Sequence, residues 1–137
     1  MLKEILSISG KPGLFRLISR AKNMLIVESL IDKKRIPSYA SEKVVSLDDI
    51  AIFGDSGEIP LREVFAKIKE KEGGAIASID ANSDEKKLQA YFAEILPDYD
   101  RDRVFPSNIK KVILWYNLLV KNDLTDFVQS EEQEERK

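Results

Sequence analysis

The sequence predicts an α+β protein in which a small bent antiparallel sheet, or an SH3/Tudor-like barrel, precedes a helical C-terminal part. Two observations support this class. Up to about residue 53, apolar residues come in five short runs separated by turn residues, and beyond Gly57 their spacing changes from two to 3.6. The 137 residues suffice for one compact domain or two small ones. We expect a β domain at 1–55, a bridging helix and linker at 56–80, a helical domain at 81–128 and an acidic tail at 129–137.

Strands are expected where Ile, Val and Leu gather between turn residues, at 4–9, 14–20, 24–30, 35–40 and 50–53. The glycines and proline of 10–13 predict a hairpin turn after the first run. The third run is the most apolar, so we expect it to be the central strand. Pro37 removes a backbone donor and predicts an edge strand. The residues at 44–49 are interpreted as a turn that leads into the fifth strand.

Three helices follow, at 60–71, 84–96 and 107–121, with an extended linker or further strand at 75–79. Pro60 suits a first helical turn, and the pair Gly73-Gly74 suits a helix end. Residues 82–85 have capping-box spacing, and Ser107 can cap the third helix. We expect the first helix to pack against the sheet as a bridge.

The third predicted helix is apolar nearly all round. Leu114 and Leu118 lie opposite its main apolar stripe, and Trp115 lies at the flank. Two interpretations remain open. The second face is covered within the chain, which small domains generally require, or it is a contact surface for another chain.

The chain contains no His and no Cys. That composition excludes thiolate nucleophiles, Ser-His-Asp triads, disulfides and zinc sites with Cys or His ligands. Alternating acids at 98–102 begin like a calcium loop, but the glycine and distal glutamate of that loop are missing. We therefore expect a solvated interhelix loop there, with no catalytic residue, metal or cofactor in the chain.

Positive charge is concentrated near the N-terminus. The formal net charge is −2, yet residues 1–46 hold nine basic and four acidic residues. Strand alternation predicts that Arg16 and Arg20 share one face. A basic surface of this kind either binds a partner or pairs with the acidic C-terminal half. The candidate binding residues are Lys11, Arg16, Arg20, Lys22, Lys33, Lys34, Arg35, Tyr39 and Trp115.

The N-terminal residues do not read as a secretory signal, because charged and turn residues interrupt the apolar positions of 1–15. No apolar run approaches membrane-spanning length. Together with the absence of cysteine, these features lead us to expect a cytoplasmic protein.

Four segments carry a family resemblance: SISGKPGL at 7–14, NMLIVES at 23–29, KRIP at 34–37 and SLDDI at 46–50. They resemble a Bacteroidetes family of small conserved proteins of unknown function, in which an N-terminal domain with such a motif precedes a helical part. The similarity extends over most of the chain, including the helix around Trp115. The resemblance implies a bacterial source and a cytoplasmic location, and it implies no activity.

The function that these observations favour is that of a non-catalytic binding or adaptor protein with a protein partner. Recognition would use the β domain or the helix that contains Trp115. The alternative is nucleic-acid binding through the basic N-terminal half, although a pI near 5.3 is unusual for that class. An enzyme is the least favoured class, and we expect a monomer or weak homodimer.

Overall fold

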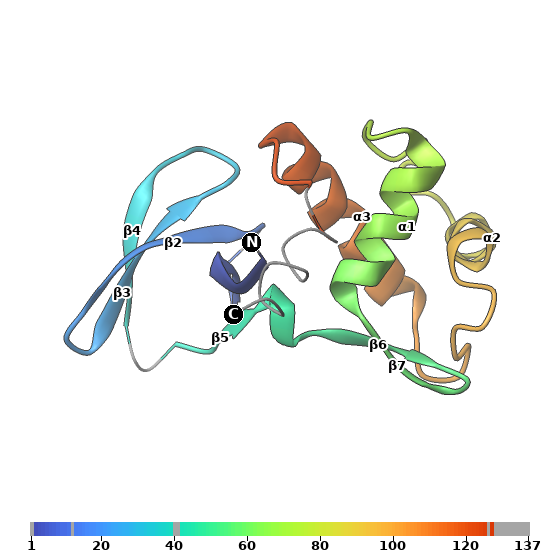
Figure 1. Cartoon of the computed structure of the whole chain (residues 1–137), viewed down its shortest axis with the longest axis horizontal. Coiled ribbons are helices and arrows are strands. Elements are labelled where there is room, and N and C mark those ends of the chain that lie inside the picture. Colours follow the sequence, from blue (N-terminus) through green and yellow to red (C-terminus); the bar gives the residue numbers. More distant parts are fainter. Residues whose placement is uncertain (1, 12, 40–41, 126, 128–137) are drawn as a thin grey trace, which may run out of the picture.

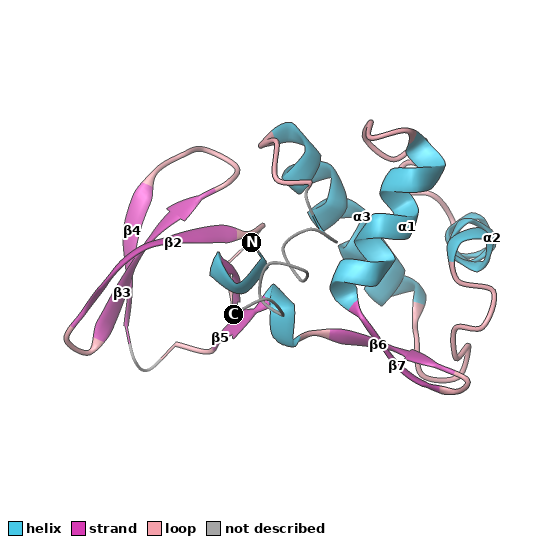
Figure 2. Ribbon diagram, viewed as in Figure 1, coloured by secondary structure: helices cyan, strands magenta, loops and turns pink. Residues whose placement is uncertain are grey.

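The computed structural model describes residues 2–11, 13–39, 42–125 and 127. Strands β1 to β5 lie at one end of the molecule and the three α-helices at the other (Figure 1). A short hairpin of β6 and β7 lies beside the helices (Figure 2). The predicted α+β class is confirmed.

The antiparallel sheet has the order β4-β3-β2-β1-β5. Its strands are β1 (Ile5–Ile8), β2 (Phe15–Ala21), β3 (Met24–Ser29), β4 (Arg35–Tyr39) and β5 (Val44–Ser46). The edge strands β4 and β5 do not pair with each other in the described part of the chain, so the sheet is not closed. Of the two predicted alternatives, the antiparallel sheet is confirmed and the barrel is wrong. Pro37 lacks a donor and β5 has only three residues, which leaves little backbone for closure.

Two details of strand order also differ from the prediction. β2 occupies the centre of the sheet, whereas β3, predicted as central, lies next to the edge strand β4. The fifth sheet strand is Val44–Ser46, which the sequence analysis assigned to a turn. The predicted strand at 50–53 is instead β6 (Ala51–Gly54), which pairs with β7 (Gly57–Pro60) in a separate hairpin.

A register shift in β2 separates two arginines that strand alternation had placed on one face. Arg16 pairs with Glu28 of β3 and Arg20 pairs with Leu25, with an irregularity between Leu17 and Ser19. Positions 28 and 25 of β3 are three residues apart and therefore lie on opposite faces. The bulge thus places Arg16 and Arg20 on opposite faces of the sheet.

Helices α1 (Leu61–Glu72), α2 (Glu85–Ile95) and α3 (Pro106–Lys121) match the three predicted helices. Pro60 precedes α1, and Gly73 ends it in a left-handed conformation. The caps of the other two differ from the prediction. Asp84 caps α2 by accepting a bond from the backbone N–H of Lys87. At α3 the side chain of Asn108 accepts the backbone N–H of Phe105, so Ser107 is not the cap.

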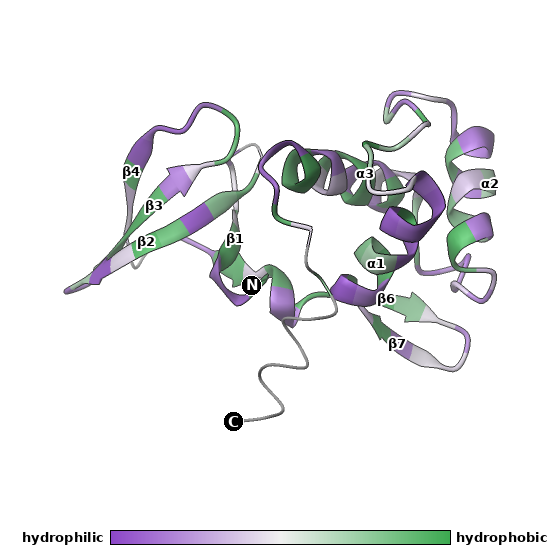
Figure 3. Cartoon of the chain, turned by 45° about the horizontal axis from the view of Figure 1, so that its top comes forward, coloured by the Kyte–Doolittle hydropathy of each residue, from purple (hydrophilic) through white to green (hydrophobic). Residues whose placement is uncertain are grey.

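The buried apolar residues form two clusters, which we call the main core and the sheet core. The main core joins the three helices to parts of the N-terminal segment. Figure 3, coloured by hydropathy, shows hydrophobic residues along all three helices. The N-terminal contributions include Leu2 and Ile5 of the first elements, Leu14, Leu30, and Leu47 of the 3-10 helix η2 (Leu47–Asp49). The sheet core consists of Leu6, Ile8, Phe15 and Val27. Helix α1 contacts η2 and β7 as well as the other helices.

The segment at 75–79 is a linker with bends and no strand. Polar bonds hold it against the helices. Tyr116 donates its hydroxyl to the carbonyl of Ala75 at 2.7 Å, and Ala77 donates its N–H to the side chain of Asn117 at 2.8 Å. Glu72 accepts bonds from Ser78 and, at 2.5 Å, from the Tyr91 hydroxyl.

These bonds predict a pH dependence of stability. Burial raises the pKa of Glu72, but the bonds from Ser78 and Tyr91 outweigh it and hold the pKa below the ordinary value of 4.5. A carboxylate whose pKa is lower in the folded than in the unfolded chain stabilises the fold at pH values above its unfolded-state pKa. That stability is lost as the pH falls through the folded-state pKa. We expect Glu72→Gln to reduce the loss of stability between pH 5 and pH 3, measured by urea unfolding at each pH. If the free energy of unfolding falls by the same amount between pH 5 and pH 3 in Glu72→Gln and in the wild type, Glu72 is not the group responsible.

Candidate binding groove

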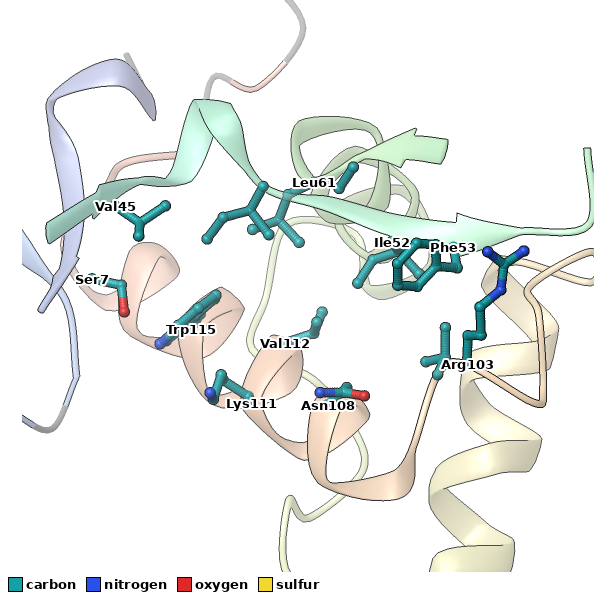
Figure 4. A pocket seen from close by; sticks show the side chains of 13 residues that line it. Ser7, Val45, Ile52, Phe53, Leu61, Arg103, Asn108, Lys111, Val112 and Trp115 are labelled. Atoms are coloured by element: carbon teal, nitrogen blue, oxygen red, sulfur yellow. The ribbon is translucent and has the colours of Figure 1, made fainter. Parts of the chain in front are cut away.

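Two adjoining cavities form a groove along one side of α3. The cavities have volumes of about 360 and 500 Å³, and both are lined by Ser7, Lys111 and Trp115. We call them the inner cavity and the outer cavity. Figure 4 shows the inner cavity, with α3 as one wall and the chain from β5 to β6 as the other.

Helical spacing explains the α3 wall. Asn108, Lys111, Val112 and Trp115 fall at i, i+3, i+4 and i+7 and therefore lie along a single side of the helix. The adjacent side of α3 is anchored in the main core through residues that include Ile109, Ile113 and Tyr116. Trp115 is half-buried, packs against the main core and lines both cavities.

The facing wall of the inner cavity is apolar. It contains Val45 of β5, Ile52 and Phe53 of β6, and Leu61 of α1 (Figure 4). The hairpin is held in place by the loop after α2, because Asp100 donates its backbone N–H to the carbonyl of Phe53 at 2.9 Å. Val45 remains 43% exposed and Phe53 41%, so this wall presents apolar surface to solvent.

The outer cavity lies between α3 and the turn that joins β1 to β2. Its lining includes Gly10, Lys11 and Gly13 of the turn with Lys110 and Leu114 of α3. Leu114 is 50% exposed, whereas Leu118, one turn further along, is half-buried and packs against the main core. The second apolar face of α3 is thus covered at Leu118 and open at Leu114.

The backbone conformation at Gly13 favours glycine. Its φ is +75°, and a Cβ there would lie 2.5 Å from Cδ1 of Ile31 and 3.5 Å from Cδ2 of Leu118. Another residue would strain the backbone and displace the exposed end of Ile31, whereas Leu118 of α3 lies at ordinary contact distance. The antiparallel pairing of β1 with β2 confirms the predicted hairpin between them.

Positive side chains surround the groove, and two of them already have carboxylate partners. Lys11 pairs with Glu42 at 3.1 Å, and Arg103 pairs with Asp100 at 2.8 Å while its guanidinium lies 4.7 Å from the centre of the Phe53 ring. The bond from Arg103 lowers the pKa of Asp100 below its ordinary value.

The other two cations are Lys110 and Lys111, which are exposed and have no ion pair among the described residues. The ammonium of Lys111 lies 5.8 Å from the centre of the Trp115 ring, a cation–π arrangement.

Of the residues predicted as binding residues from the sequence, Lys11 and Trp115 meet in the outer cavity. The others do not join them there. Arg16 and Arg35 both lie opposite Glu28, and Arg35 forms an ion pair with it at 3.3 Å. The remaining predictions lie elsewhere on the β part: Arg20 and Tyr39 beside another pocket, Lys22 in the β2–β3 turn, and Lys33 and Lys34 in the β3–β4 loop.

The binding residues predicted from the sequence did not include Lys110, Lys111 and Arg103, because the prediction rested on the excess of positive charge in the N-terminal half. A signal was present, since Lys111 precedes Trp115 by one helical turn.

The acidic segment at 98–102 packs against the hairpin of β6 and β7. Tyr99 is buried against Phe92 and forms a bridge with Gly54, while Asp100 bonds Arg103. No group of three or more Asp or Glu side chains suited to a metal ion occurs in the described parts of the chain. The acidic tail predicted at 129–137 lies outside the described residues. Within the same described parts, we find no helix with the length and apolar character needed to cross a membrane.

Comparison with known proteins identifies the family. Residues 50–119 match a model described as a domain of unknown function (DUF6852), and residues 2–47 match a second domain of unknown function (DUF5606). The chain belongs to the DUF6852 family, whose model matches half of it. A solution NMR structure of a protein from Bacteroides vulgatus, a structural genomics target, is 58% identical in sequence, with a TM-score of 0.77. The match covers 93% of this chain and 91% of that chain.

These matches confirm the resemblance to a Bacteroidetes family. No curated protein matches the chain. The two family segments meet between residues 47 and 50, at η2. The groove uses both, because Ser7 and Lys11 belong to the first segment and Lys111 and Trp115 to the second.

Proposed function

We propose that the chain is a non-catalytic protein-binding or adaptor module of the bacterial cytoplasm and that the groove along α3 is its recognition site. The observation that carries this proposal is the gathering of partly exposed apolar side chains, Val45, Phe53 and Leu114, around Trp115 with lysines at the rim. Tryptophan in a pocket with surrounding apolar contacts is typical of residues that contribute most to protein–protein affinity.

Nucleic-acid binding stays a prediction, with less support from the geometry. The basic residues of the β part are distributed over both faces of the sheet, and several lie beside carboxylates. A nucleic-acid groove would place cations along a continuous track. Retention on heparin with steep salt dependence would favour the alternative.

The test is affinity capture from native lysate with the tagged wild-type chain, two groove variants and one control variant. We expect one partner to be retained by the wild type and lost with Leu114→Ser, which alters an exposed groove residue and leaves the core intact. Trp115→Ala should also lose it. Phe105→Ala is the matched control, because Phe105 is 57% exposed and outside the lining of both cavities. Equal retention by all variants would refute the groove as the binding site.

A further inference from the structure

We infer that the groove binds an acidic peptide segment that inserts one apolar side chain into the inner cavity. This inference rests on the proposed function and specifies the partner's chemistry. Charge, shape and the position of Trp115 support it.

The charge of the groove is of one sign. Among the residues that line the two cavities, Lys11, Arg103, Lys110 and Lys111 are basic and none is Asp or Glu. Since Lys11 and Arg103 have carboxylate partners within the chain, Lys110 and Lys111 are the cations with free capacity among the described lining residues. Both line the outer cavity, and Lys111 also lines the inner one. Carboxylates of a partner would pair with them there.

The inner cavity suits an apolar anchor. Ile52, Leu61, Val112 and the ring of Trp115 line its walls, and its volume is about 360 Å³. Burial of one large aliphatic side chain there removes apolar surface from water and so favours binding. Because the cavities share Ser7, Lys111 and Trp115, a short segment that fills the inner cavity passes directly to the lysine pair.

A peptide fits these features better than a nucleic acid. Single-stranded nucleic acids bind through successive aromatic platforms along a basic track. Here Trp115 and Phe53 are the aromatic side chains in the lining, and the Phe53 ring is already covered by Arg103. The basic pair is short, and the adjoining cavity wall is aliphatic.

The probe is the acetylated and amidated peptide Glu-Asp-Glu-Leu-Asp-Glu, titrated into the full chain. Trp115 is the single tryptophan, so its fluorescence and its indole N–H signal in NMR report on the groove alone. We expect saturable changes in both. A peptide with Gln and Asn in place of the acids, and one with Ala in place of Leu, should each bind at least about tenfold more weakly.

The variants Lys110→Glu and Lys111→Glu, combined, should weaken binding of the acidic peptide by about tenfold or more. Lys86→Glu with Lys87→Glu is the matched control, because these exposed lysines of α2 give the same change in net charge away from the groove. Far-UV circular dichroism checks that each variant is folded. The pair Lys110→Gln and Lys111→Gln repeats the test with half the change in charge.

The inference is overturned by equal affinity for the acidic and the amide peptide, by unchanged binding in the lysine variants, or by poly(U) RNA that shifts the indole signal where the peptide does not. Its failure is distinguishable from failure of the proposed function. If the captured partner is lost with Leu114→Ser and retained by the lysine variants, the groove still binds protein and the acidic ligand is wrong.

Discussion

Phe65→Ala is expected to lower the free energy of unfolding by about 3–5 kcal/mol, the usual cost of truncating a buried aromatic ring. Phe65 is fully buried on the inner side of α1. Its ring centre lies 5.3 Å from that of Phe127 and 6.5 Å from that of Tyr116. The substitution therefore removes one member of an aromatic cluster and leaves a cavity between α1 and α3.

Chemical denaturation followed by circular dichroism at 222 nm measures this effect. Phe105→Ala is the control, because it makes the same chemical change at a side chain that is 57% exposed. We expect the control to cost less than about 1 kcal/mol. A difference of under about 1 kcal/mol between the two variants would show that the aromatic cluster does not hold the helices together.

The class of fold and the three helices could be predicted because they depend on local patterns. The spacing of Leu61, Val64, Phe65 and Ile68 defines the buried side of α1, and Gly73 marks its end. Strand order could not be predicted in the same way, since pairing joins residues far apart in the chain. The local sequence around Val44 and Val45 is typical of a turn, and these residues form a strand because they pair with β1.

The hairpin of β6 and β7 was missed for a related reason. Gly57, Glu58 and Pro60 are all poor strand residues, yet their backbone pairs with Ala51–Gly54 and packs beside α1. The bulge in β2 likewise has no clear local signal, and it reverses the face of Arg20. A predicted surface that depends on strict alternation is therefore unreliable wherever a strand contains a bulge.

Only part of the candidate groove could be predicted from the sequence. Trp115 and Lys11 were selected from the sequence, but only the packing of the β1–β2 turn against α3 brings them to one cavity. Gly13 of that turn has a positive φ, a conformation that favours glycine. Sequence patterns within α3 could not reveal which of its two apolar sides stays open.

Leu14→Ala is expected to destabilise the sheet and the helices together, by about 2–5 kcal/mol. Leu14 is fully buried in the main core, and its carbonyl accepts the N–H of Leu30 at 2.9 Å. Asn122, just after α3, donates to the carbonyl of Leu30 at 3.2 Å. These contacts join both sides of the boundary predicted near residue 55, so truncation at Leu14 weakens the junction itself.

Val27→Ala provides the comparison that separates one cooperative unit from two independent domains. Val27 is fully buried in the sheet core, and the substitution removes two methyl groups there without touching the main core. If the chain unfolds as one unit, Val27→Ala lowers the denaturant midpoint that the near-ultraviolet circular dichroism of Trp115 reports. It then also lowers the protection of the β3 amides from hydrogen exchange by the same free energy. If 1–55 is an independent domain, only β3 responds to Val27→Ala, and Trp115 keeps its wild-type midpoint. The shared main core favours the first result, because a sheet that unfolds alone would remove Ile5 of β1 from that core and expose it to water.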